Sequence, residues 1–199
     1  MYRARGRIVL GSGSPRRREL LALAGIELTV RATGVPEDAR DGEGPHEHAL
    51  RLARDKALAA SSIDPGAVAL GADTIVVVDG EILGKPRDGA EAVRMLLSLA
   101  GRTHEVLTGW ALARDGVLLT SDVSRTEVEF RPLTHAEASL YAATGEPLDK
   151  AGAYGIQGQG ALFVRAIRGS YTNVVGLPLV EVLAALLDAG VIAPCEVAS

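Results

Sequence analysis

Three arginines directly follow a glycine- and serine-rich turn near the start of the chain. The stretch reads LGSGSPRRRELLALAG from Leu10 to Gly25, and the short apolar run Arg7–Leu10 leads into it. Pro15 suits the first position of a helix, and Ser14 before it suits the N-cap. Backbone N–H groups and the positive end of the dipole at a helix start attract anions. The stretch therefore predicts a strand, a turn that could hold an anion, and a helix.

Two of the arginines, Arg16 and Arg17, share a helix face with apolar residues, whereas Arg18 points away from it. The apolar members of that face are Leu20, Leu21, Leu23 and Ala24. Guanidinium groups make bidentate contacts with phosphate. Cations oppose the dipole at a helix N-terminus, so a bound anion explains their position better than a basic surface turn, the alternative that stays open.

Asp73 lies inside the apolar segment VALGADTIVVV, where a carboxylate is costly unless it is paired, hydrogen-bonded or bound to a metal. One interpretation is that Asp73 caps a turn together with Thr74 and interrupts the strand. The functional interpretation is a carboxylate at a strand end that faces a cleft. In that position it could act as a metal ligand or as a general base.

Two lysines also stand out. Lys56 falls on the apolar face of the helix predicted over residues 48–60. Its stem could lie along apolar surface with the ammonium in solvent, or the ammonium could turn inward and require an anionic partner. Lys85 occupies a tight Gly-Lys-Pro turn before a helix, but the glycine spacing and the Ser or Thr of a Walker A loop are missing.

Further charged residues lie beside glycine-rich turns. Glu37 and Asp38 belong to a long polar loop, and each alone suits a solvated position. Asp149 and Lys150 precede AGAYGIQGQG, whose glycines either form a plain turn or allow the backbone to approach a ligand. This combination of cations and carboxylates suits a phosphorylated ligand with a hard divalent cation held by oxygen atoms.

The elements that must position these residues alternate between helices and hairpins. Strands are predicted over residues 7–10, 67–78, 81–83, 105–113, 117–120 and 125–130, with two-residue turns at 79–80 and 115–116. Helices are predicted over residues 15–24, 48–60, 88–99, 134–143 and from Pro178 onward. This mixture predicts an α/β fold with a mixed central sheet flanked by helices, in a single domain over residues 1–199.

Composition limits the classes of function. The 199 residues are 47% hydrophobic and 23% charged, as expected of a globular protein. A net charge of −4 argues against a general binder of nucleic acid polymers. Cys195 is the single cysteine, so no internal disulfide can form. No signal-peptide core follows Met1 and no apolar run approaches a membrane span, so we expect a cytoplasmic protein.

Four motifs in order resemble the Maf (septum-formation) family of nucleoside triphosphate pyrophosphatases. They are SGSPRRRELL, GADTIVVVDGEILGKPRD, GRTHEVLTG, and DKAGAYGIQGQGALFV with GSYTNVVGLPL. The resemblance runs from Leu10 to about Leu187. It implies hydrolysis of a nucleoside triphosphate between the α and β phosphates. It also implies a homodimer and an elongated, two-lobed fold with a deep cleft, related to inosine triphosphate pyrophosphatases.

The resemblance also implies roles for individual residues. Asp73 matches the family's proton acceptor. The residues that match its polar cleft are Ser12, Arg16, Arg17, Glu37, Lys56, Lys85, Asp149 and Lys150. Arg16, Thr74 and Gln157 match the branch that acts on dTTP and UTP, whereas the 7-methyl-GTP branch has Trp after the Ser-Pro pair. Pro36 precedes Glu37 and Asp38 here, which leaves open which of the two is the loop acid.

These residues support a mechanistic hypothesis. Glu37 and Asp73 would hold Mg²⁺ or Mn²⁺, and Asp73 would orient or deprotonate the attacking water. The triphosphate would be bound by the Ser12–Ser14 backbone and by Arg16, Arg17, Lys56 and Lys85. Gln157 could read a base edge, because an amide offers both a donor and an acceptor. The alternatives are a nucleotide-binding regulator of septation without turnover, and a phosphatase that releases orthophosphate.

Overall fold

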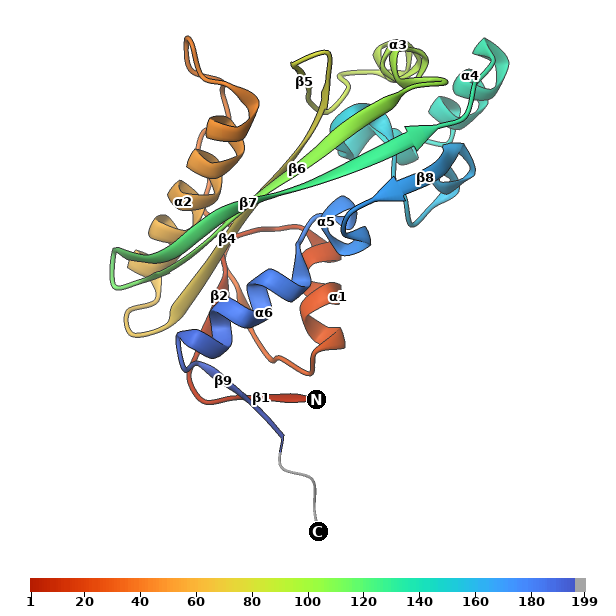
Figure 1. Cartoon of the computed structure of the whole chain (residues 1–199). Helices are drawn as coiled ribbons and strands as arrows, with labels where there is room; N and C mark the ends of the chain where they lie inside the picture. The colour runs from red at the N-terminus through yellow and green to blue at the C-terminus, as the bar shows by residue number, and fades with distance from the viewer. Residues whose placement is uncertain (196–199) are drawn as a thin grey trace. The chain divides into compact units, whose positions relative to one another are not determined.

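The computed structural model describes residues 1–195 as two compact units, each assembled from separate stretches of chain (Figure 1). The first unit contains Met1–Asp73, Thr108–Ser124 and the stretch that begins at Gly176. The second contains Thr74–Leu107 and Arg125–Val175. Neither unit is one continuous segment. The predicted single domain, with its elongated shape and cleft, stays a prediction.

Within residues 1–195, seven strands form one mixed sheet in the order β3-β2-β4-β6-β7-β8, with β5 paired to β4. The strands are β2 (Ile8–Leu10), β3 (Thr29–Val30), β4 (Val68–Val78), β5 (Glu81–Leu83), β6 (Thr103–Arg114), β7 (Val117–Phe130) and β8 (Val164–Arg168). β2 runs parallel to β3 and β4, whereas the β4–β5 and β7–β8 pairs are antiparallel. A separate antiparallel pair joins β1 (Tyr2–Ala4) to β9 (Ile192–Pro194). The predicted mixed sheet is confirmed.

Three helices belong to the first unit: α1 (Pro15–Leu23), α2 (Pro45–Ile63) and α6 (Leu179–Asp188). Helix α1 begins at Pro15 after Ser14, as predicted, although the Ser14 side chain makes no capping hydrogen bond. Its buried residues are Arg17, Leu20 and Leu21, and Ala24 at its C-cap is buried as well. Leu23 was expected on the buried face, but it is 74% exposed.

Small residues bring α2 close to the sheet beneath it. A Cβ atom on Gly71 of β4 would overlap the backbone of Ala53 and Ala57, and one on Gly109 of β6 would overlap the carbonyl group of Ala49. Overlaps of this kind leave no room for a side chain at either strand position. The backbone of α2 therefore lies directly against these strands.

The second unit holds α3 (Gly89–Leu99), α4 (His135–Ala143) and α5 (Tyr171–Val175), with the short 3₁₀ turns Glu146–Asp149, Ala151–Ala153 and Gln159–Phe163. Figure 1 shows α3 and α4 side by side. Thr134 and Glu137 form the predicted capping box of α4. Asp88 caps α3 by accepting the Glu91 N–H, but the Glu91 carboxylate accepts the N–H of Arg87 and not that of Asp88.

Two strand predictions were wrong. Asp73 and Thr74 do not interrupt β4, which runs without a break over Val68–Val78, so Asp73 lies inside the strand and neither at its end nor in a turn. The segments predicted as separate strands over 117–120 and 125–130 are the two ends of β7. The predicted two-residue turns are confirmed, with Asp79 and Asp115 at positive φ. No helix of the described chain is long and apolar enough to cross a membrane.

Candidate functional site

The ammonium group of Lys56 bridges two carboxylates in the first unit. Its Nζ lies 2.6 Å from Asp73 Oδ1 and 2.6 Å from Glu37 Oε1. Lys56 and Asp73 are buried, whereas the Glu37 side chain is 54% exposed. The Lys56 ammonium therefore turns inward and is paired with anions, and it does not extend into solvent.

The periodicities of β4 and α2 explain how this pair meets. Alternate residues of a strand share a face, so Asp73 lies on the same face as Gly71, which is packed against Ala53 and Ala57 of α2. Lys56 precedes Ala57 on that helix and reaches Asp73 across the close contact. A buried ion pair that loses one partner leaves an uncompensated charge, so the two residues depend on each other.

The loop that carries Glu37 is fastened by a second ionic group. The Arg51 guanidinium donates two hydrogen bonds to the Glu43 carboxylate and a third to the carbonyl oxygen of Asp38, at 3.0 Å. The side chains of Arg51 and Glu43 are both largely buried, and His48 also contacts Glu43 at 2.9 Å. Asp38 thus contributes its backbone to this anchor, and Glu37 contributes its side chain to the Lys56 bridge.

Arg17 and Ser12 form the next part of the site. Arg17 Nη1 donates to Ser12 Oγ at 2.8 Å, and Arg17 Nε donates to the carbonyl oxygen of Gly176, also at 2.8 Å. The Ser14 N–H donates to the same Ser12 hydroxyl at 3.3 Å. One buried guanidinium therefore organises both the serine turn and the start of α1.

The charges in this part of the first unit act on one another. Burial lowers the pKa of Arg17, and the positive charge of Arg16 lowers it further, whereas the negative charges of Asp73 and Glu37 raise it. Arginine nevertheless stays protonated in proteins. The first unit thus gathers Ser12, Ser14, Arg16, Arg17, Glu37, Lys56 and Asp73 around one group of opposed charges.

The remaining predicted residues belong to the second unit. Lys150 Nζ lies 2.6 Å from Asp149 Oδ1, so this adjacent pair forms an ion pair. Lys85 is exposed in its turn, and the preceding carbonyl of Gly84 accepts the N–H of Gly152, which places that turn beside the segment after Lys150. Thr74 follows Asp73 on β4 and is half-buried, and Gln157 is exposed.

Sequence reasoning did not single out Glu146. Its side chain accepts hydrogen bonds from the phenol of Tyr141 and from the backbone N–H groups of Gln159 and Gly160. A Cβ atom on Gly158 would overlap the Glu146 carboxylate. The glycines of this run therefore allow close approach to a side chain of the protein itself. No motif marks Glu146, and the signal available was a lone acid before a glycine-rich run.

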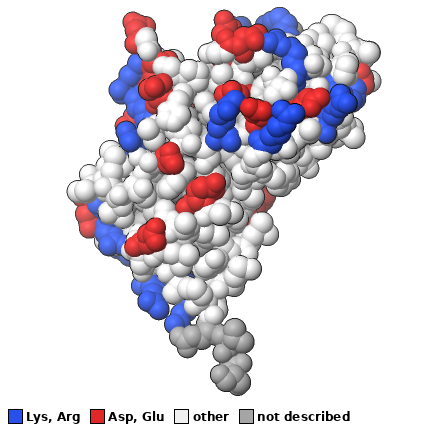
Figure 2. Space-filling model, viewed as in Figure 1, with Lys and Arg blue, Asp and Glu red and all other residues white. Residues whose placement is uncertain are grey.

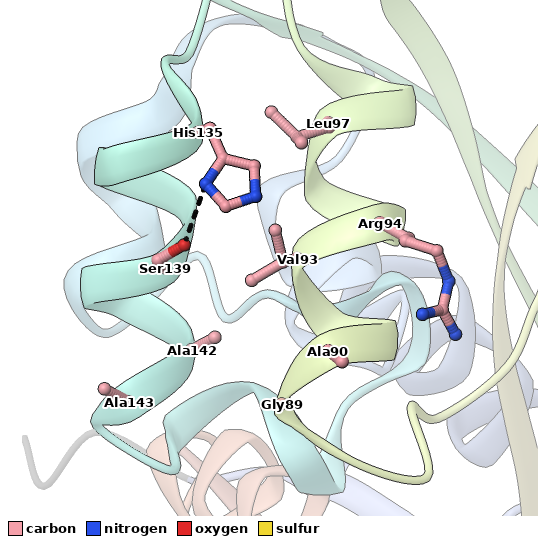
Figure 3. Close-up of a pocket in the computed structure, with 9 residues that line it drawn as sticks. All are labelled: Gly89, Ala90, Val93, Arg94, Leu97, His135, Ser139, Ala142 and Ala143. Carbon is pink, nitrogen blue, oxygen red and sulfur yellow. Dashed lines mark hydrogen bonds between the residues drawn. The ribbon is translucent and has the colours of Figure 1, made fainter.

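A cavity of about 680 Å³ lies elsewhere in the second unit, between α3 and α4 (Figure 3). Its lining is mostly apolar: Gly89, Ala90, Val93, Arg94, Leu97, His135, Ser139, Ala142 and Ala143. Arg94 points away from the space between the helices, and His135 Nδ1 contacts Ser139 Oγ at 3.2 Å. The cavity lacks converging charges among its lining residues, so it is a poor candidate for phosphate chemistry.

Charges of both signs are interspersed on the face that Figure 2 shows. No continuous basic patch covers the described residues visible there. A surface that binds a nucleic acid polymer carries such a patch or stripe. This face offers none, in line with the net charge of −4.

The donors available for a metal ion are carboxylate oxygens. Within residues 1–195, no three or more His, Cys, Asp or Glu side chains are grouped so that they could hold a metal ion. Glu37 and Asp73 lie on either side of the Lys56 ammonium nitrogen, which occupies the point between Oε1 and Oδ1, so a metal ion would be held by their other carboxylate oxygens. Two carboxylates suit a hard divalent cation that takes its other ligands from water and phosphate oxygens.

Comparisons with known proteins agree with the motifs. The family model described as "Maf-like protein" matches residues 7–189. A "dTTP/UTP pyrophosphatase" of Geobacter metallireducens is 57% identical over 187 residues, covering 92% of this chain and 96% of the relative. The protein of the same name from Geobacter sulfurreducens is 57% identical over 182 residues, covering 90% of this chain and 94% of the relative.

A solved structure shares the fold. It is a HAM1 protein from Coxiella burnetii, with a TM-score of 0.50 and 16% identity, and the match covers 92% of this chain and 98% of that one. At this identity the likeness concerns the fold alone, and it agrees with the predicted α/β class. The family match extends over nearly the whole chain, and the chain belongs to the Maf family.

Proposed function

We propose that this protein hydrolyses dTTP and UTP to the nucleoside monophosphate and pyrophosphate. The observation that carries the proposal is the buried Lys56–Asp73 pair with Glu37, in a chain 57% identical to relatives named dTTP/UTP pyrophosphatase. A buried carboxylate held by a lysine can orient a water molecule and accept its proton. The lysine beside it can offset negative charge on a phosphate group.

Asp73 is the proposed proton acceptor. Its carboxylate would orient the attacking water and take its proton, while Lys56 holds the carboxylate in place. Glu37 and Asp73 would hold Mg²⁺ or Mn²⁺. When bound, such a cation lowers the pKa of water and offsets the charge of the triphosphate. Glu37 is favoured over Asp38 for this role because its side chain already reaches Lys56.

Arg16, Arg17 and the Ser12–Ser14 turn would bind the triphosphate. Arg17 is buried and its guanidinium is oriented by Ser12 and Gly176, so its contribution needs little reorganisation when substrate binds. Lys85, Asp149 and Lys150 would also contact substrate, because they match polar cleft residues in the family motifs.

Arg16, Thr74 and Gln157 would set the preference for thymine and uracil bases. All three match the dTTP/UTP branch by residue type. The family resemblance further supports a cytoplasmic homodimer that acts on free nucleotides, with no nucleic acid polymer or membrane as partner. Light scattering coupled to size-exclusion chromatography tests the dimer.

Pyrophosphate release from purified protein tests the reaction. The substrates are dTTP, UTP, CTP, GTP, ATP and 7-methyl-GTP, each with and without Mg²⁺ or Mn²⁺. We expect metal-dependent pyrophosphate from dTTP and UTP, and none from the Asp73→Asn variant. Orthophosphate as the product would favour the phosphatase alternative. Nucleotide binding without turnover would favour a regulator.

A further inference from the structure

A carboxylate and a phenol hold the glycine-rich run of the second unit. Glu146 Oε2 accepts the Gln159 N–H at 3.0 Å, and Glu146 Oε1 accepts the Gly160 N–H at 3.4 Å. The phenol of Tyr141 donates to Glu146 Oε1 at 2.8 Å. The same phenol oxygen accepts the Gly155 N–H at 3.1 Å. The backbone is thus held on both sides of residues 156–158.

The glycines of the run fit closely around these two side chains. A Cβ atom on Gly158 would overlap the Glu146 carboxylate, and one on Gly160 would come within 2.9 Å of the Tyr141 hydroxyl. A Cβ atom on Gly155 would lie 2.6 Å from Cε of Lys150. Glycine at these three positions lets the loop wrap around Glu146 and Tyr141, so the loop has little freedom to shift.

Glu146 is suited to this role because it is ionised. Burial alone would raise the pKa of its carboxyl group, but the hydrogen bonds from Tyr141, Gln159 and Gly160 and the charge of Lys150 outweigh burial and lower it. An ionised carboxylate accepts several hydrogen bonds at once, and those bonds are stronger than neutral ones.

Gln157 lies in the middle of the segment that is held in this way, and its side chain is exposed. An amide offers one donor and one acceptor on a short arm, so it reads a base edge at a fixed place only if the backbone that carries it is held in position. We propose that Glu146, acting through Tyr141 and the backbone of residues 155–160, positions Gln157 to discriminate between bases. This inference rests on the proposed function, and Glu146 is a positioning residue that need not touch substrate.

The test compares kcat/KM for dTTP with kcat/KM for CTP and ATP in the wild type and in Glu146→Gln. The amide places an N–H₂ group where N–H and O–H donors now converge. We expect the dTTP preference to fall roughly tenfold, about the loss of one hydrogen bond to the base. The loss appears in KM, while kcat for dTTP stays within about twofold. The matched control is Glu81→Gln, an exposed acid of β5, which keeps the preference.

Tyr141→Phe provides a second route if Glu146→Gln folds poorly. It keeps the buried ring but removes the hydroxyl that joins Gly155 to Glu146, so the preference again falls. The double variant Glu146→Gln with Gln157→Ala separates positioning from a structural role. We expect it to discriminate no less than Gln157→Ala alone, because both changes act through one side chain.

Two results would overturn the inference. One is an unchanged dTTP preference in both Glu146→Gln and Tyr141→Phe. The other is an equal loss of activity for every base, additive with Gln157→Ala, which indicates support of the fold only. A wild type that releases no pyrophosphate from any nucleotide would instead contradict the proposed function. If the wild type prefers dTTP and both Glu146→Gln and Tyr141→Phe keep that preference unchanged, only this inference is contradicted.

Discussion

Lys56 is the residue on which the carboxylates of the first unit depend. In Lys56→Ala, Asp73 stays buried without its cation, and it faces Glu37 with no positive charge between them. Breaking a buried ion pair costs roughly 3–5 kcal/mol, and positioning errors at a reacting group lower kcat by orders of magnitude. We expect Lys56→Ala to lose about 3 kcal/mol in urea unfolding and at least roughly a hundredfold in kcat.

Arg54→Ala is the control for Lys56→Ala. Arg54 lies on the same helix, but it is exposed and bonds only to the Ser121 hydroxyl among the contacts described. Its loss should change stability by no more than about 0.5 kcal/mol and leave kcat unchanged. Equal behaviour of the two variants would contradict the role assigned to Lys56.

His104 makes stability depend on pH. It is buried against Phe130, and its Nε2 lies 2.9 Å from the Tyr154 hydroxyl. Burial lowers the pKa of His104 to about 4 from the usual 6.5. Between these values the unfolded chain binds a proton that the folded protein does not, so stability falls as pH falls through this window. The contribution is at most about 1.4 kcal/mol for each pH unit.

Urea unfolding between pH 7 and pH 4 measures this dependence. We expect His104→Leu to be less stable at pH 7 but to lose less stability than the wild type as the pH falls. His135→Gln, at an exposed position of α4, should keep the wild-type slope. A slope that is the same in His104→Leu and the wild type would show that other groups carry the dependence.

At the scale of residues, the sequence could predict which side chains lie on a buried face, but not which side chains contact one another. Helical periodicity placed Lys56 on the buried face of its helix, and the cost of burial marked Asp73 as unusual. That the two meet depends on the packing of α2 against β4, which no local pattern contains. Glu146 lies outside every apolar pattern, so its three hydrogen bonds emerge only from the folded chain.

At the scale of elements, the approach of α2 to the sheet depends on glycine. Gly71→Ala would place a methyl group against the backbone of Ala53 and Ala57 and push the helix away. Lys56 would move with the helix and lose its geometry with Asp73. Overpacking costs typically 1–3 kcal/mol, so we expect a loss of about 2 kcal/mol and a large fall in kcat. Thermal unfolding and initial rates measure both.

Gly89→Ala is the matched control for Gly71→Ala. Gly89 opens α3, its φ is not positive, and a Cβ atom there meets nothing within 4 Å. Alanine favours helix more than glycine does, so this variant should be as stable as the wild type or slightly more stable. Normal activity in Gly71→Ala would show that α2 can shift without disturbing Lys56.

Most elements could be predicted from the sequence, because caps, turns and apolar runs are local signals. Thr134 with Glu137 and the turn at Asp79 were found in this way. The continuity of β4 could not be found, because a charged residue inside a strand signals a break unless its partner is known. The middle of β7 is likewise polar and partly exposed, and only its pairing in the sheet extends the strand.

At the scale of the whole molecule, the net charge and the local charges of the site predict opposite effects of salt on the binding of an anionic substrate. The chain carries −4, which repels a triphosphate at long range. Arg16, Arg17 and Lys56 lie in one unit and attract it locally, with two carboxylates that a divalent cation would offset. Charges in solvent interact over about 30 Å at 0.01 M salt but only about 10 Å at 0.1 M, so added salt weakens the long-range repulsion more than the local attraction.

We expect local charge to dominate, because a substrate in contact with the site lies closer to its cations than to the scattered surface acids. Raising KCl from 0.01 to 0.3 M at constant free Mg²⁺ should then raise the KM for dTTP several-fold and change kcat little. Arg16→Ala should show a weaker dependence, because one of the attracting charges is gone. A KM that falls as salt is added would mean that the net charge governs binding, and that Arg16 and Arg17 contribute little to the attraction.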